Sequence, residues 1–185
     1  MENTVPSIDQ VTLVNAILAA TSEVFDVMLN LAVTPGPAYR DRPNSEPTDG
    51  VVALIGLAGP WVGTGLIQCD TDLARVLFSH LVKVEAAPGG DGVDGEVLDA
   101  VAEIANMIVG NVKTTLEERL GPMGMSIPTV VFGRNFTTRG GGSEPWTIVP
   151  FTCRDSRLLV KICLTHHPEP AEHHRGAVVP RGFAL

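Results

Sequence analysis

The stretch DGEVLDAVAEIANMIVGNVKTTLEERL, residues 94–120, decides the fold of this sequence. Its apolar residues recur at intervals of three and four, which is the repeat of an amphipathic α-helix. We expect this helix to begin near Asp94 and to end at Gly121 and Pro122. The apolar residues that share one side are Val97, Val101, Ile104, Ala105, Ile108, Val112 and Leu116. We expect that side to be buried.

The opposite side of the predicted helix carries Asp99, Glu103, Asn106 and Gly110. Glu103 and Asn106 are surface neighbours at i and i+3, and Gly110 follows Asn106 by four residues. A glycine inside a helix costs about 1 kcal/mol relative to alanine, so Gly110 needs a local reason. One reason is the close approach of another backbone at Gly110, which would leave Glu103 and Asn106 free to reach a partner.

Two further helices and five strands are predicted around this helix. Apolar residues at helical spacing predict a long first helix within residues 7–33 and a second helix from about Asp72 to Lys83. Gly59 and Pro60 favour a hairpin turn between the first two strands. The predicted strands are residues 51–57, 61–69, 128–133, 146–153 and 157–165.

The order of these elements predicts an α/β (α+β) domain. Helix, two strands, two helices and three strands suit a layered domain with a mainly antiparallel sheet and long helices packed on it. Residues 34–50 are expected to be a surface connection, and residues 137–145 a loose glycine-rich hairpin. We expect one domain over residues 1–165 and a flexible C-terminal tail over residues 166–185, which contain two His-His pairs and three prolines.

Composition limits the classes of partner. The chain has 13 Lys and Arg against 21 Asp and Glu, and its formal charge of -8 argues against nucleic acid or an anionic membrane. Residues 1–10 lack a secretory signal, and no uninterrupted apolar run reaches the roughly 18 residues of a membrane span, so we expect a soluble, cytoplasmic protein. Cys69, Cys153 and Cys163 have no metal-ligand spacing and are interpreted as core residues.

The polar side of the helix resembles that of the CheC, CheX and FliY chemotaxis phosphatases, whose helices carry an acidic residue, two intervening residues and an asparagine. Here the match reads DAVAEIANMIVGNVK, residues 99–113, and extends well beyond the Glu-x-x-Asn pair. Only one copy is evident, because Glu23 in the first predicted helix is followed three residues later by Asp26 rather than asparagine. A single copy is similar to the CheX type, whereas CheC and FliY usually carry two.

The resemblance implies a phosphatase that removes the phosphoryl group from a CheY-like response regulator. It implies that Asn106 orients the attacking water and that Glu103 pairs with the regulator's active-site lysine. Asp99, Gly110 and Lys113 are the candidate partner-binding residues, although Asp99 and Lys113 also suit a solvated surface. The resemblance further implies Mg²⁺ on the partner, no metal or cofactor on this chain, and a homodimer with the last strands as candidate edges.

Other interpretations of the same residues stay open. Glu103 and Asn106 also suit the ordinary solvent-facing side of an amphipathic helix. The chain could instead be a non-catalytic module or scaffold that sequesters a phosphorylated regulator. Two His pairs could supply metal ligands, but they lack a supporting Cys or acid and lie in a Pro-rich tail; they are His166, His167, His173 and His174. His80 is interpreted as a partly buried histidine with satisfied hydrogen bonds.

Overall fold

The structure is a computed structural model that describes residues 8–42, 47–84, 93–138 and 145–167. Its helices are α1 (Gln10–Glu23), the π-helical continuation η1 (Val24–Met28), α2 (Thr71–Val82) and α3 (Gly95–Leu120). Its strands are β1 (Thr34–Pro35), β2 (Tyr39–Asp41), β3 (Thr48–Ala58), β4 (Trp61–Cys69), β5 (Gly124–Met125), β6 (Thr129–Phe136), β7 (Trp146–Cys153) and β8 (Ser156–His166). The fold is therefore the expected mixture of helices and a sheet.

The described strands form one antiparallel sheet. Its central order is β7, β8, β4 and β3; β1 and β2 pair with the outer side of β7, and β5 and β6 pair with the outer side of β3. The β3–β4 hairpin turns at Gly59 and Pro60, as predicted, and pairs Leu57 with Gly63 next to the turn. Gly59 has a φ of +147°, which a residue with a side chain rarely adopts.

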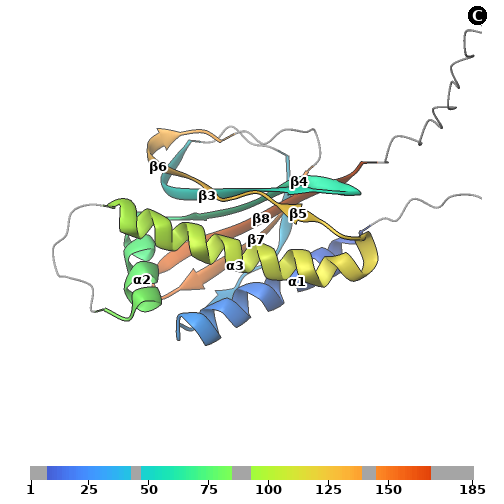
Figure 1. Ribbon diagram of the computed structural model, residues 1–185. Coiled ribbons are helices and arrows are strands. Elements are labelled where there is room, and N and C mark those ends of the chain that lie inside the picture. The colour runs from blue at the N-terminus through green and yellow to red at the C-terminus, as the bar shows by residue number, and fades with distance from the viewer. Residues whose placement is uncertain (1–7, 43–46, 85–92, 139–144, 168–185) are drawn as a thin grey trace, which may run out of the picture.

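The three α-helices lie on one side of this sheet (Figure 1). α1 and α2 both pack against α3, and α3 also contacts β3, β4 and β6. Alternate residues of β3 point to the two sides of the sheet. Ala53 and Ile55 belong to the main core beneath the helices, whereas Val52 belongs to a smaller cluster that includes Leu66 and Ile148. Burial on both sides explains why the sequence of β3 is almost continuously apolar.

Two expectations about the strands are wrong. Residues 34–50, expected to be a connection, contain the short strands β1 and β2 and the beginning of β3. The last strands are not edges of the sheet, because β8 lies between β7 and β4, and β7 is itself covered by β1 and β2. Neither short strand has enough alternating apolar residues to be recognised, and both depend on hydrogen bonds from β7.

The first helix is shorter than predicted and ends in a π-helical turn. Asp9 caps α1 by accepting a hydrogen bond from the Thr12 amide at 2.7 Å. The segment Gln10–Met28 has the length and apolar composition of a membrane-crossing helix. However, Ile17 and Phe25 on its inner side are fully buried in the domain core. A helix that packs in a protein core can have the same length and apolar composition as a membrane-crossing helix.

The first residue of the predicted C-terminal tail belongs to the last strand. β8 continues through His166, whose ring makes an edge-to-face contact with Trp61 at a centroid distance of 5.3 Å. The His167 amide then donates a hydrogen bond to the Pro60 carbonyl at 2.8 Å. His166 is therefore part of the sheet, and His167 is hydrogen-bonded to the β3–β4 turn, whereas His173 and His174 lie outside the described residues.

The three cysteines are buried, as predicted. Burial raises the pKa of the Cys69 thiol to about 12, and the neighbouring carboxylate of Asp70 acts in the same direction. Burial also raises the pKa of Cys153. The Cys69 and Cys153 thiols are therefore protonated at neutral pH and suit a packing role rather than a nucleophilic one.

Candidate functional site

Helix α3 is fixed at both ends by its own sequence. The Asp94 side chain accepts a hydrogen bond from the Val97 amide at 3.0 Å and so caps the start of the helix. At the other end, Gly121 has a φ of +83° and its amide donates to the Glu117 carbonyl. The seven apolar residues predicted to share the inner side of the helix are all buried. The rotation of α3 about its axis is thereby set, and its polar side must face outward.

A glycine of β4 sets how close α3 lies to the sheet. A Cβ atom on Gly65 would come within 2.6 Å of Val109 Cγ2 and 2.8 Å of Val109 Cγ1. Val109 is fully buried. Only a glycine leaves room for this side chain, so Gly65 allows α3 to lie directly against β4.

The predicted working pair lies on the outer side of α3. Glu103 is exposed, Asn106 is half-buried, and Asp99, one turn before Glu103, is also exposed. Within the described part of the chain, Glu103 and Asn106 make no hydrogen bond or ion pair with other side chains. A carboxylate and a carboxamide are thus presented together and without competing partners, which is how groups that act on a second molecule must be held.

The packing around Gly110 gives no reason within the described residues for a glycine. Among the described residues, no backbone of another element approaches it; a Cβ on Gly110 would meet Met125 Sδ at 3.8 Å and Met125 Cε at 3.9 Å. These are ordinary van der Waals distances, so alanine would fit. The packing of the described residues therefore does not require a glycine at this position.

The segment after β5 borders this side of α3 and was not predicted from the sequence. Met125 lies against Gly110, and Ile127, two residues further along, is 86% exposed. Ser126 holds the segment: its amide donates to the Gly56 carbonyl at 2.9 Å, and its Oγ accepts from the Gly56 amide at 2.9 Å. A large apolar side chain is thus exposed from an anchored backbone. In the sequence, the run Met125-Ser126-Ile127-Pro128 was the only local indication of this exposed apolar segment.

Lys113 is engaged within α3. Its Nζ forms an ion pair with Glu117 Oε1 at 2.8 Å. Hydrogen bonding from Lys113, and secondly from the Met123 amide, holds the pKa of Glu117 below its ordinary value. Glu117 therefore connects the last turns of α3 to the chain entering β5. The ammonium group of Lys113 is accordingly less available to a partner than the carboxylates of Asp99 and Glu103.

Comparison with protein families identifies the chain. The family model described as "Chemotaxis phosphatase CheX" matches residues 51–152, which are more than half of the chain and include the whole of α3. The chain belongs to the CheX family. No curated protein sequence matches the chain.

Solved structures of CheX proteins have the same fold. The chemotaxis protein CheX of Vibrio vulnificus is 28% identical, covers 83% of this chain and 99% of its own, and has a TM-score of 0.72. A CheC-like chemotaxis protein of Shewanella oneidensis is 27% identical, covering 85% and 100%, with a TM-score of 0.71. CheX of Borrelia burgdorferi, solved in a complex with CheY, BeF₃ and Mg²⁺, is 27% identical, covering 85% and 99%, with a TM-score of 0.67.

The remaining sequence candidates fall outside this site. His80 is half-buried and its two ring nitrogens are both engaged, by the Leu29 carbonyl and by Arg154, as expected for a satisfied histidine. Glu23, in the helix tested for a second motif, accepts a hydrogen bond from Asn111 at 3.3 Å. Among the described residues, no three His, Cys, Asp or Glu side chains gather as a metal site would require.

Proposed function

We propose that this CheX-family protein hydrolyses the aspartyl phosphate of a CheY-like receiver domain. The observation that carries the proposal is the pair Glu103 and Asn106, which stand one helical turn apart on the outer side of α3 without partners among the described residues. The Borrelia relative was crystallised with CheY, which supports a receiver domain as the partner. The aspartyl phosphate is the group on a receiver that such a pair can reach.

Asn106 would orient the attacking water. Its side-chain oxygen accepts a hydrogen bond from the water, and its NH₂ group donates to a phosphoryl oxygen or a backbone carbonyl. Placing a water in line with the breaking P–O bond supplies most of what hydrolysis needs, because the reaction requires little covalent chemistry from the protein. Asn106 has no proton to exchange in the neutral range, so it acts by positioning.

Glu103 would fix the docked geometry. Its carboxylate is exposed, and pairing with a receiver lysine gives a charge-assisted hydrogen bond that strengthens as the interface excludes water. Mg²⁺, present in the Borrelia complex, would belong to the receiver and neutralise the phosphoryl oxygens. This chain then contributes two side chains and no metal of its own.

Four neighbours would complete the contact with the receiver. Asp99 extends the acidic side of α3 by one turn, and Gly110 leaves the partner's backbone room to approach on the other side of Asn106. Lys113 would contact the partner through its aliphatic stem, because Glu117 holds its ammonium group. Ile127, which is 86% exposed and follows by two residues the Met125 that lies against Gly110, would add buried apolar area to the contact.

We further propose that the protein works in the cytoplasm as a homodimer. Receiver domains signal in that compartment. Exposed strand edges readily pair with a second chain, and the outer strands here are β1, β2, β5 and β6. β6 carries Phe132, which is 45% exposed and suits such an edge contact.

The test is phosphate release from a phosphorylated receiver domain with the protein at one-hundredth of the receiver concentration. Asn106→Ala should reduce the turnover rate by about 100-fold, with receiver binding retained. Glu103→Ala should weaken binding as well as turnover. Glu118→Ala, which removes an exposed carboxylate from the last turn of the same helix, is the matched control. Binding without multiple turnovers by the native chain would favour the sequestering module instead.

A further inference from the structure

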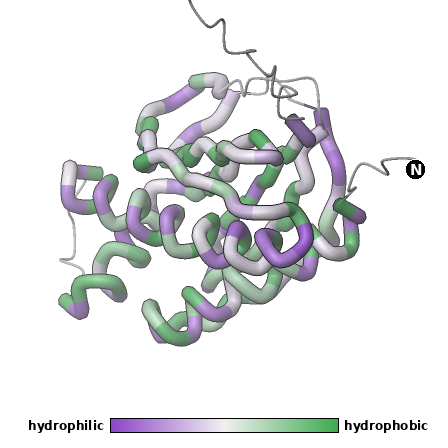
Figure 2. Tube along the Cα trace, turned by 45° about the vertical axis from the view of Figure 1, so that its right-hand side comes forward, coloured by the Kyte–Doolittle hydropathy of each residue, from purple (hydrophilic) through white to green (hydrophobic). Residues whose placement is uncertain are grey.

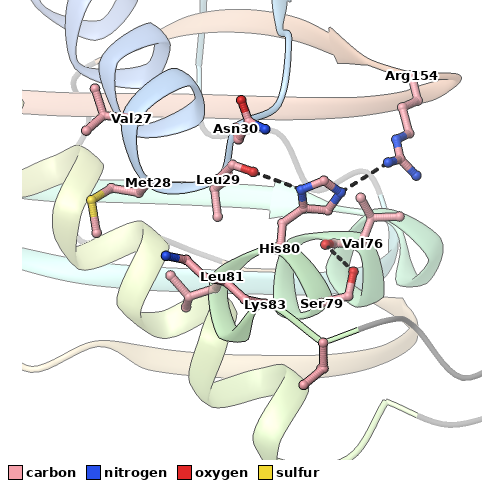
Figure 3. A pocket seen from close by; sticks show the side chains of 11 residues that line it. Val27, Met28, Leu29, Asn30, Val76, Ser79, His80, Leu81, Lys83 and Arg154 are labelled. Atoms are coloured by element: carbon pink, nitrogen blue, oxygen red, sulfur yellow. Dashed lines mark hydrogen bonds between the residues drawn. The ribbon is translucent and has the colours of Figure 1, made fainter.

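A cleft separate from the proposed phosphatase site lies between η1, the C-terminal part of α2 and the turn that joins β7 to β8. It has a volume of about 1010 Å³ and is open to solvent (Figure 3). None of the five residues assigned to the phosphatase site lines it. No residue of α3 lines the cleft, although η1 and α2, which form its walls, both pack on α3.

The charged side chains Lys83 and Arg154 among the described residues that line this cleft are cationic, and its other polar side chains are Asn30, Ser79 and His80. Lys83, Arg154 and His80 line it, and no Asp or Glu is among the described lining residues, although the chain carries a formal charge of -8. Among the described residues, Asp26 and Asp155 are the carboxylates nearest in sequence to the lining, and both are exposed and lie outside it. A local positive region on an acidic protein favours an anionic ligand.

His80 is held in one orientation within this positive region. Its Nδ1 lies 2.8 Å from the Leu29 carbonyl oxygen, and its Nε2 lies 3.1 Å from Arg154 Nη2 (Figure 3). A carbonyl only accepts and a guanidinium only donates, so Nδ1 carries the proton and Nε2 accepts from Arg154. Arg154 is thereby held across the cleft with its other N–H groups available.

The backbone around the cleft is unusual at three places. Asn30, Lys83 and Arg154 have φ values of 49°, 56° and 54°, and all three line the cleft. Only one other non-glycine residue in the described part of the chain has a positive φ. The π-helical turn η1 forms one wall. Lys83 caps the end of α2, Asn30 follows the cap of η1, and Arg154 lies in the turn between β7 and β8, so three chain reversals meet at this cleft.

The rim of the cleft is apolar and exposed. Val27 is 69% exposed, Val84 52% and Met28 45%, and all three line the cleft. The ends of η1 and α2 are accordingly coloured largely hydrophobic in Figure 2. Exposed aliphatic side chains gathered around a cleft, rather than scattered singly, mark an interaction surface.

We propose that this cleft is a docking site for an acidic, apolar peptide segment of a partner protein. Carboxylates of the segment would pair with Lys83 and Arg154, and its apolar side chains would cover Val27, Met28 and Val84. A peptide suits the cleft better than a small molecule, because small ligands are mostly enclosed by their sites whereas this cleft is open to solvent. The proposal does not depend on the phosphatase activity.

The test begins with selection of random 12-residue peptides, displayed on phage, against the full-length protein. An enriched peptide is then synthesised with a fluorescent label and titrated by anisotropy. We expect enriched sequences to combine Asp or Glu with Leu, Ile, Val or Phe. Lys83→Glu should weaken binding by at least about tenfold, and added NaCl should weaken it further.

Three variants, a competing fatty acid (dodecanoate) and a measurement of self-association complete the design. Val27→Ser tests the apolar rim at an exposed position, and Arg40→Glu, an exposed charge reversal on β2, is the matched control. Arg154→Gln tests the second cation, with melting curves to establish that each variant folds. The proposal is overturned by peptides without acidic bias, by equal binding to Lys83→Glu, by dodecanoate binding in place of peptide, or by a self-association that Lys83→Glu abolishes.

Discussion

Replacing Gly110 by alanine tests whether this glycine is needed for packing within the chain or for contact with a partner. Gly110 lies in the interior of α3, where alanine is favoured by about 1 kcal/mol. The added methyl group would meet Met125 Sδ at 3.8 Å and Cε at 3.9 Å, so no neighbour needs to move. We therefore expect Gly110→Ala to raise the free energy of unfolding by about 1 kcal/mol and the melting midpoint by about 2–4 °C.

The same methyl group should impair the proposed reaction. It would project from the side of α3 that carries Asn106, where the receiver is proposed to lie against the helix. A displacement of about 1 Å at such an interface can cost about 100-fold in rate, so we expect turnover to fall by about 10- to 100-fold. The variant would then be more stable and less active than the native chain.

Two assays measure these effects. Urea unfolding followed by circular dichroism gives stability, and phosphate release from a phosphorylated receiver gives turnover. Ala102→Gly, on the same helix, is the matched control and should lose about 1 kcal/mol of stability. A lower stability of Gly110→Ala would refute the packing argument. Increased stability with unchanged turnover would remove Gly110 from the proposed interface.

Three further changes test the fold. Gly65→Ala places a methyl group 2.6 Å from Val109 Cγ2 and should cost about 1–3 kcal/mol in urea unfolding; a neutral result would mean that α3 can move away from β4. Asp94→Ala should cost about 1 kcal/mol by leaving the Val97 amide unpaired, and Asp94→Asn should restore most of it. For Cys69, the folded-state pKa of about 12 exceeds the unfolded value of 9.0, so the thiol's contribution is complete below pH 9. That contribution is lost as pH rises, by about 1.4 kcal/mol per pH unit; Cys69→Ala should show a shallower decline between pH 9 and 10.5.

Local sequence was sufficient to predict α3 and its two sides. Asp94, the apolar repeat and Gly121 act over a few residues, and the alternatives at each position differ by about 1 kcal/mol or more. Because a helix has a fixed repeat, the same pattern also placed Glu103 and Asn106 together on the outer side. The hairpin at Gly59 and Pro60 was predictable for the same reason.

Other features depended on contacts between distant residues, and only the tertiary structure decided them. β1 and β2 exist through pairing with β7, more than a hundred residues later, and carry little pattern of their own. The placement of the segment that carries Ile127 follows from the hydrogen bonds between Ser126 and Gly56, which are 70 residues apart. The basic cleft joins Leu29, His80 and Arg154 from three separate elements. Sequence determines what each segment can form alone; the packing of the segments determines which surfaces they form together.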